Sequence, residues 1–304
     1  CHDLIERGNE VICLDNFATG KRENINDLKS NPKFRLIDGD IRDPETCNKA
    51  AKGVDVVLHQ AALGSVPRSI ADPATTNAVN INGFLNMLIA TRDAGIKRFV
   101  YASSSSVYGD SPELPKVEER TGKVLSPYAI TKLVNEEYAR VFGNLYGMET
   151  IGLRYFNVFG RRQDPNGPYA AVIPKFTMAF MKHESPVING DGSNSRDFTY
   201  IDNVVLANNL AATVENSAAY NQAYNVACGD SVNLNEMTSL LRSYLAEKDP
   251  KIAMVNPLHG PNRAGDIPHS MASIGKAVRL IGYKPLVLFG EGLKYAVEWY
   301  VDNL

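Results

Sequence analysis

The chain has 304 residues, of which 44% are hydrophobic and 22% charged, and its formal net charge is -2. This composition predicts a globular protein with a sizeable core, and it excludes wholesale disorder and a general attraction to nucleic acid. No apolar run reaches the ~18 residues that a membrane-spanning helix needs. The four cysteines are scattered, so we expect no disulfide framework and no metal site, and we expect a cytoplasmic location.

Strand-like and helix-like segments alternate along the first half of the chain. Residues 2–7, followed by Gly8 and Asn9, have the pattern of a helix end and its cap. Short apolar runs then predict strands, and longer runs between several of them predict helices. This alternation is typical of an α/β fold with a Rossmann-like, doubly wound parallel sheet. The predicted strands are 10–15, 34–38, 54–59, 98–102 and 149–154, and the predicted helices are 44–52, 75–94 and 127–146.

A dinucleotide-binding sheet normally starts with a strand and a Gly-rich turn, followed by a helix whose N-terminus binds the pyrophosphate. The printed sequence has no such turn. We therefore expect the first strand and the Gly-rich loop to precede Cys1.

The second half of the chain has a different texture. Residues 161–168 and 189–195 are rich in Gly, Pro, Asn and Asp, which predicts loops. The helical runs between and after them, together with short strands, favour a smaller, mixed α/β domain. The predicted helices are 173–183, 202–215, 233–247, 273–280 and 290–302.

Polar or small residues follow three of the predicted strands. Asp15 ends the first strand, Asp40 and Ile41 follow the second, and a Gln-Ala-Ala run at 60–62 follows the third. In open parallel sheets, ligands bind beyond the carboxyl ends of the strands, and an acidic residue there accepts ribose hydroxyls. The three positions together favour a dinucleotide site, and Asp15 favours NAD over NADP.

A possible reaction centre lies further along the chain. Tyr128 and Lys132 are four residues apart on a predicted helix, so their side chains share one face. The ammonium of Lys132 is expected to lower the pKa of Tyr128 toward neutrality, which would make Tyr128 a general base. A run of four serines at 103–106 follows a predicted strand and supplies hydroxyls for a substrate oxygen.

With these motifs, the sequence resembles the extended short-chain dehydrogenase/reductase superfamily. Within it, the chain is similar to the UDP-sugar 4-epimerases, above all to the UDP-N-acetylglucosamine 4-epimerases. The resemblance covers nearly the whole chain, and it is carried by LDNFATG, GDIRD, LHQAALGSVPRS, ASSSSVYGD, SPYAITK, GLRYFNVFGRRQDPNGPYAAVIPK, INGDGSNSRDF and AGDIPHS.

The resemblance implies an NAD-binding domain, a nucleotide-sugar-binding domain and a set of site residues. The NAD-binding domain would comprise 1–166 and 198–229, and the nucleotide-sugar-binding domain 167–197 and 230–304. The implied catalytic residues are Ser104, Tyr128 and Lys132. The implied NAD contacts are Asp15, Asn16, Phe17, Thr19, Gly20, Asp40, Ile41, Gln60, Ala61, Ala62, Asn80, Tyr128, Lys132 and Tyr155. The implied substrate contacts are Ser65, Ser104, Ser105, Tyr128, Asn157, Ala171, Val172, Lys175, Phe176, Asn189, Arg196, Arg263, Asp266 and Ser270.

Three positions discriminate among the relatives. Related 4,6-dehydratases carry Asp-Glu where this chain has Ser105 and Ser106, so dehydration is disfavoured. Epimerases restricted to non-acetylated sugars carry a bulky Tyr where this chain has Ser270. The smaller serine leaves room for a 2-acetamido group, to which Ser65 and Ser105 would donate.

The expected reaction is therefore 4-epimerisation of a UDP-hexose through a transient 4-keto sugar. The favoured pair is UDP-N-acetylglucosamine and UDP-N-acetylgalactosamine, with UDP-glucose and UDP-galactose also open. Arg68 keeps a UDP-uronic acid 4-epimerase, or another NAD-dependent nucleotide-sugar enzyme, as an alternative, and a non-catalytic NAD/UDP-sugar sensor is a third. The family also implies a homodimer, with helices 75–94 and 127–146 of each subunit in a four-helix interface.

Overall fold

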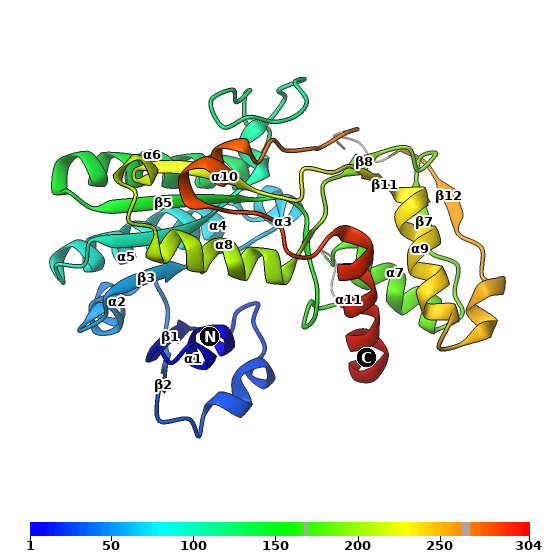
Figure 1. Cartoon of the computed structure of the whole chain (residues 1–304), viewed down its shortest axis with the longest axis horizontal. Coiled ribbons are helices and arrows are strands. Elements are labelled where there is room, and N and C mark those ends of the chain that lie inside the picture. Colours follow the sequence, from blue (N-terminus) through cyan, green and yellow to red (C-terminus); the bar gives the residue numbers. More distant parts are fainter. Residues whose placement is uncertain (167–169, 263–267) are drawn as a thin grey trace. The chain divides into compact units, whose positions relative to one another are not determined.

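The computed structural model describes residues 1–166, 170–262 and 268–304 (Figure 1). The chain divides into two compact units, each described here by itself. Unit 1 comprises residues 1–111, 121–154 and 208–224, and unit 2 comprises residues 112–120, 155–207 and 225–304. The two domains predicted from the sequence are defined by the ligand that each is expected to bind, and the two units are defined by contacts between residues. The predicted domain boundaries therefore stay a prediction.

All five strands predicted in the first half are present in the structure. Strands β1 (Val11–Asp15) and β2 (Phe34–Asp38) pair in parallel as a sheet of two. A second sheet has the order β10-β5-β4-β3. It consists of β3 (Val56–His59), β4 (Arg98–Ser104), β5 (Glu149–Tyr155) and β10 (Gln222–Val226), and β3 is parallel to β4. The α/β class is confirmed, although the five strands predicted in the first half lie in two separate sheets.

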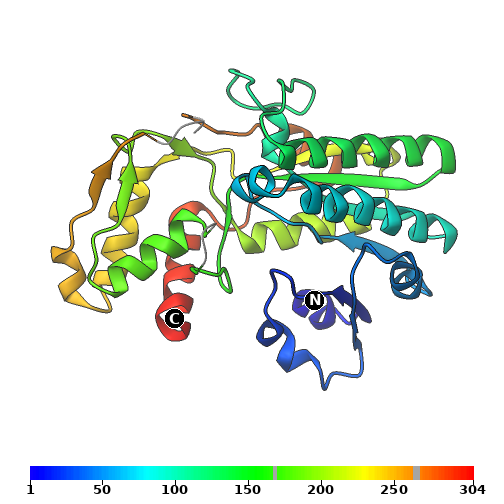
Figure 2. The same cartoon turned by 180° about the vertical axis from the view of Figure 1, so that it is seen from behind.

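Helices cover the larger sheet on both faces (Figures 1 and 2). Helices α5 (Phe84–Asp93) and α6 (Pro127–Tyr146) lie on one face, and the end of α8 (Ile201–Thr213) lies on the other. The aromatic rings of Phe84, Phe99 and Tyr101 pack edge-on or tilted against one another between sheet and helices. This apolar layer packs α5 against β4.

Local signals in the sequence account for several helix ends. Helix α1 (His2–Glu6) is followed by Gly8, whose φ of 89° suits glycine, and Asn9 closes the turn by donating to the carbonyl of Leu4. Helix α6 has the predicted bounds, because Ser126 caps its first turn and Gly147 adopts the left-handed conformation at its end. The remaining helical segments of unit 1 are η1 (Arg22–Leu28), α2 (Pro44–Ala51), α3 (Val66–Ala71), η3 (Ser105–Tyr108) and η4 (Ser217–Ala219).

The predicted helix 75–94 differs from a regular α-helix. It consists of α4 (Pro73–Asn77), a π-helical segment η2 (Ala78–Gly83) and α5. π-Helical turns are rare and often lie at functional sites. The segment carries Asn80, which the resemblance places against the cofactor.

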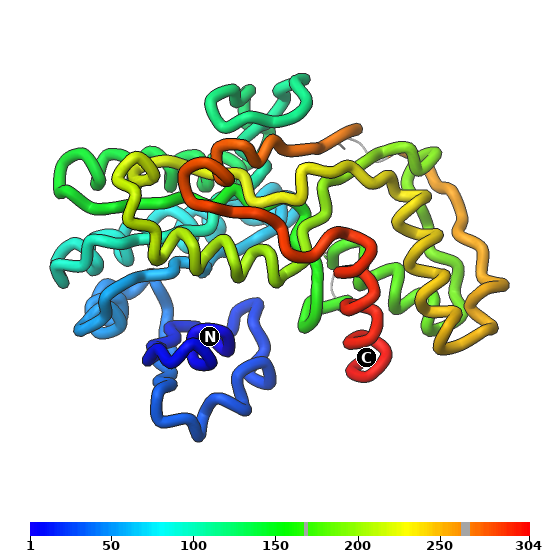
Figure 3. Tube along the Cα trace, in the orientation of Figure 1, coloured from blue at the N-terminus to red at the C-terminus, as the bar shows by residue number. Residues whose placement is uncertain are grey.

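The described part of unit 2 consists of helices and three short two-stranded sheets. The helices are α7 (Val172–Met181), the first part of α8, η5 (Pro250–Met254), α9 (Leu234–Ala246), α10 (Gly275–Ile281) and α11 (Phe289–Asn303). The sheets pair β6 (Val158–Phe159) with β9 (Thr199–Tyr200), β7 (Val187–Asn189) with β12 (Leu258–Gly260), and β8 (Ser195–Arg196) with β11 (Val232–Asn233). Figure 3 shows β7 and β12 side by side although α9 lies between them in the sequence. All five helices predicted in this half are present, with ends shifted by a few residues.

The core of unit 2 consists of aromatic and aliphatic side chains from α7, α9 and α11, among them Phe176, Phe180, Leu241 and Tyr300. Nowhere in the described ranges is there a helix with the length and apolarity needed to cross a membrane.

Candidate active site

Unit 1 brings the three predicted catalytic residues together. Ser104 ends β4, and its side chain is hydrogen-bonded to the hydroxyl of Tyr128 in the first turn of α6. The Nζ of Lys132 lies 5.9 Å from the centre of the Tyr128 ring and donates to the carbonyl of Ala102 at 2.8 Å. Because Tyr128 and Lys132 are one helical turn apart, both face the carboxyl end of β4.

The electrostatics of this cluster differ from the sequence-based expectation. Burial raises the pKa of Tyr128, and the hydrogen bond from Ser104 lowers it less than burial raises it. The predicted downward shift is therefore wrong for the protein alone, since a phenolate is poorly solvated at this depth. Burial also lowers the pKa of Lys132 to about 8, while the charge of Glu136 acts in the opposite direction.

Ser69 is a site residue that the sequence reasoning missed. Its side chain is fully buried, and its Oγ accepts a hydrogen bond from the backbone N–H of Tyr128 at 3.0 Å and donates to Val66 O at 2.7 Å. The first N–H groups of a helix have no partner within the helix, so Ser69 fixes the start of α6 from outside. The position of Ser69, four residues after Ser65, was the signal available in the sequence. That spacing does not indicate that Ser69 binds a residue of α6.

Asn80 connects the π-helical segment to two functional segments. The side chain is 1% exposed; it accepts from Leu63 N at 2.7 Å and donates to Leu63 O at 3.1 Å and to Thr131 Oγ1 at 3.2 Å. Leu63 belongs to the loop after β3, and Thr131 precedes Lys132 on α6. Asn80 therefore positions both segments, whereas the resemblance implies a direct NAD contact.

The ends of β1 and β2 form a second polar cluster. Asp15 Oδ1 accepts from Phe17 N at 2.7 Å, and Asn16 donates to Asp40 Oδ2 at 2.9 Å. Arg42 binds both oxygens of Asp40 and holds the pKa of that carboxyl at about 2. A carboxylate at the end of a strand of this kind accepts hydrogen bonds from ribose hydroxyls, so this group of residues fits the adenosine half of NAD.

The other predicted cofactor residues lie around these two clusters. Thr19 and Gly20 are exposed in the loop after β1, and Ala61 and Ala62 are half-buried after β3. Gln60 donates to Asn208 at 2.9 Å. Ile41 is buried against η2, where a Cβ on Gly83 would lie 2.6 Å from the Ile41 side chain, so glycine permits this close approach.

Ser65 starts α3 in a strained conformation. Its φ is 122°, which is rare for a residue with a side chain, and its Oγ accepts from Arg68 N at 3.2 Å. Such strain concentrates at functional sites. Ser105 opens η3 directly after Ser104.

Unit 2 gathers three of the predicted substrate residues around β8. Asn157 Nδ2 donates to Asp197 O at 3.2 Å, and Arg196 Nη1 donates to Pro268 O at 3.2 Å. Ser270 N donates to Ser195 O at 3.1 Å, so the segment that carries the proposed specificity residue is paired with the segment that carries Arg196.

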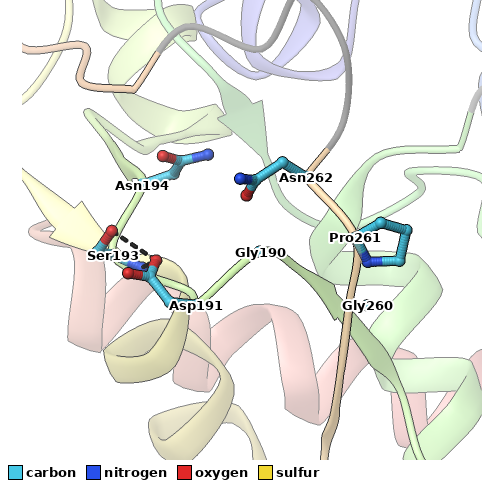
Figure 4. Close-up of a pocket in the computed structure, with 7 residues that line it drawn as sticks. All are labelled: Gly190, Asp191, Ser193, Asn194, Gly260, Pro261 and Asn262. Atoms are coloured by element: carbon cyan, nitrogen blue, oxygen red, sulfur yellow. Dashed lines mark hydrogen bonds between the residues drawn. The ribbon is translucent and has the colours of Figure 1, made fainter.

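A polar pocket lies where β7 and β12 end, next to Asn189 (Figure 4). Figure 4 shows Asn194 and Asn262 on opposite sides of the pocket, while Ser193 bonds to Asp191. Both strands are parallel, so their carboxyl ends meet at this pocket, as expected for a ligand site. The lining residues are Gly190, Asp191, Ser193, Asn194, Gly260, Pro261 and Asn262.

The other predicted site residues of unit 2 do not gather in one cluster. Lys175 on α7 and its N-cap Ala171 are exposed, Val172 and Tyr155 are half-buried, and Phe176 belongs to the core of unit 2. Arg263 and Asp266 lie outside the described residues.

Known proteins resemble this chain over nearly its whole length. The profile of the NAD dependent epimerase/dehydratase family matches residues 1–227. A putative UDP-glucose 4-epimerase of Methanocaldococcus jannaschii is 37% identical over 302 residues, which are 99% of this chain and 93% of that protein. The UDP-glucuronate 4-epimerase 4 of Arabidopsis thaliana is 34% identical over 322 residues, covering 98% of this chain and 71% of that protein. The solved structure of the UDP-N-acetylglucosamine 4-epimerase from Methanobrevibacter ruminantium M1, in complex with UDP-N-acetylmuramic acid, has a TM-score of 0.90 and 40% identity, and the match covers 97% of this chain and 92% of that one.

Proposed function

Since this chain belongs to the NAD dependent epimerase/dehydratase family, we propose that it interconverts UDP-N-acetylglucosamine and UDP-N-acetylgalactosamine. The general activity follows from the relatives of this chain: it is an NAD-dependent UDP-sugar 4-epimerase, and hence an isomerase. The observation that carries the proposal is the hydrogen-bonded Ser104–Tyr128 pair with Lys132 beside it, because a protein that only binds nucleotide sugars needs no buried base.

The residues of unit 1 supply the acid–base chemistry. In its phenolate form, which Lys132 would stabilise, Tyr128 would remove the proton from the 4-hydroxyl of the sugar, and Ser104 would hydrogen-bond to the same oxygen and orient it. Lys132, with its pKa of about 8, is an ammonium at neutral pH and stabilises the phenolate of Tyr128. The same three groups return the proton when the 4-keto sugar is reduced.

The cofactor site is proposed from the polar residues of unit 1. Asp15 would hold the adenosine ribose, Asn16 and Asp40 would border it, and Tyr128 and Lys132 would face the nicotinamide ribose. Bound at this site, NAD would supply the hydride acceptor for carbon 4 of the sugar and the hydride donor for the opposite face of the 4-keto sugar.

Unit 2 supplies the groups proposed to hold the nucleotide. Arg196 offers planar, bidentate donors that suit diphosphate oxygens, and Asn157 lies beside the same strand. The pocket next to Asn189 offers amides and backbone groups of the kind that read a uracil edge. These contacts would keep the UDP moiety fixed while the 4-keto sugar rotates about its diphosphate linkage.

The preference for an acetylated sugar rests on the size of Ser270. A serine at this position lacks the phenol ring found in relatives restricted to non-acetylated sugars. Ser270 lies near Arg196, because Ser270 N bonds to Ser195 O and Arg196 Nη1 bonds to Pro268 O. Ser65 and Ser105 would donate to the acetamido group.

A UDP-uronic acid is the second candidate substrate. Arg68 lies on α3 and its backbone N–H bonds to Ser65, so a cation is present near a proposed sugar contact. The Arabidopsis UDP-glucuronate 4-epimerase relative agrees with this reading.

The test is to incubate the purified, full-length protein separately with UDP-N-acetylglucosamine, UDP-glucose and UDP-glucuronate, with and without added NAD, and to separate the products. The proposal expects UDP-N-acetylgalactosamine to form fastest. Faster turnover of UDP-glucuronate would favour the second candidate, and nucleotide-sugar binding without turnover in any arm would favour a sensor.

We also propose a homodimer through α5 and α6. On α6, Ile130, Val141 and Leu145 are 48%, 37% and 69% exposed, and they recur at helical spacing along one side. An exposed apolar stripe of this kind marks an interaction surface.

A further inference from the structure

Two neighbouring residues of β4 bind two residues of α6 that are one helical turn apart. Ala102 O accepts from Lys132 Nζ at 2.8 Å, and Ser103 Oγ donates to Glu136 Oε1 at 2.5 Å. Both contacts immediately precede Ser104. The pair of contacts fixes the position of α6 along β4, and with it the depth at which Lys132 sits.

Glu136 is also held from β5 by a buried arginine. Arg154 donates to the two carboxylate oxygens at 2.9 and 2.8 Å, and its third nitrogen bonds to Tyr108 Oη at 3.1 Å. The side chains of Arg154 and Glu136 are 6% and 10% exposed. A buried ion pair seldom adds net stability, because desolvation offsets the attraction between the charges. A pair beside a reactive lysine therefore calls for a role other than stability.

We infer that Glu136 is a positioning residue for the epimerisation, and that its immobilised carboxylate keeps Lys132 in place and in the ammonium form. This inference rests on the proposed function. Glu136 touches neither substrate nor cofactor, and it acts through Lys132, whose ammonium stabilises the phenolate of Tyr128.

Among the groups around Lys132, Glu136 is the one that favours the ammonium form of Lys132. Burial lowers the pKa of Lys132 to about 8, and Glu136 raises it. On β3, burial and the charge of Lys132 lower the pKa of His59 to about 3, so this ring is neutral. Burial raises the pKa of Tyr101 on β4 and of Tyr128 on α6, so both are neutral phenols at pH 7.

The guanidinium of Arg154 is paired with Glu136, and the two charges offset each other. Removing the charge of Glu136 therefore leaves burial, and the uncompensated Arg154, to lower the pKa of Lys132 further. The ammonium would then be lost at a lower pH.

The test compares Glu136→Gln with Glu137→Gln in the NAD-loaded enzyme. Glutamine keeps the shape of Glu136 and its hydrogen bond from Ser103 but removes the charge. Glu137 is the next residue of α6 and has a side chain that is 58% exposed, paired with Arg140 at the surface, so it is a matched control. The measurements are kcat and KM for the favoured UDP-sugar from about pH 6 to about pH 9.

The inference expects the alkaline limb of kcat in Glu136→Gln to move down by about one pH unit or more, with KM changed less than about twofold. Glu137→Gln should keep the profile of the wild type, and Glu136→Asp, which retains the charge, should keep the alkaline limb at a lower kcat. A folded Glu136→Gln with the wild-type alkaline limb would overturn the inference. Absence of epimerase activity in the wild type would instead overturn the proposed function.

An unpaired buried arginine is strongly destabilising, so Glu136→Gln is also made together with Arg154→Met, which removes both charges. In the double variant the alkaline limb should still move down, because the negative charge one helical turn from Lys132 is missing. An unshifted limb in this folded variant would equally overturn the inference.

Discussion

Replacing Asn80 with alanine separates a structural role of this residue from a role in cofactor binding. Its side chain makes three hydrogen bonds, two to the backbone of Leu63 and one to Thr131, and it is 1% exposed. At about 1 kcal/mol for each bond, Asn80→Ala should lower the free energy of unfolding by about 3 kcal/mol. We expect a stability loss as large as this because the variant leaves the N–H and C=O groups of Leu63 without their hydrogen-bond partner in the π-helical segment.

The measurement is urea unfolding followed by circular dichroism, with Asn82→Ala as the matched control. Asn82 lies in the same π-helical segment but is exposed, so its replacement should change the stability by less than about 0.5 kcal/mol. The reasoning is refuted if Asn80→Ala loses less than about 1 kcal/mol. A stable variant with weakened NAD binding would instead support the direct cofactor contact that the family resemblance implies.

Three further predictions concern the reaction, the sugar and the assembly. Tyr128→Phe should lower kcat by about 10³-fold or more while UDP binding, measured by calorimetry, is unchanged; undiminished turnover would contradict the role of Tyr128 as base. Ser270→Tyr should reduce kcat/KM for UDP-N-acetylglucosamine about tenfold or more while UDP-glucose is affected much less, and an equal loss on both sugars would remove the steric argument. Leu145→Glu should shift the mass measured by light scattering from dimer to monomer without unfolding the chain, since a charge would be buried in the interface, and a dimer that persists unchanged would place the interface elsewhere.

Local patterns in the sequence were sufficient for most elements of the fold. Ser126 followed by proline predicted the start of α6 at the correct residue, and Gly147 ends it. Apolar runs predicted the strands, and the alternation of strands and helices predicted the α/β class. The π-helical segment was not predictable in this way, because local patterns do not show which distant residues a side chain will contact. In this segment Asn80 bonds to Leu63 and to Thr131, which lie 17 and 51 residues away in the sequence.

The sequence by itself led to the prediction of which residues carry the chemistry. Motif spacing indicated Tyr128 and Lys132, since four residues are about one helical turn, and the family resemblance implied Ser104 within the serine run that follows a strand. Only the tertiary structure decided how these groups are held and charged. Ser69 reaches Tyr128 from another helix, and the Glu136–Arg154 pair joins α6 to β5. Burial, which depends on how the sheet and helices pack, reversed the expected shift in the pKa of Tyr128.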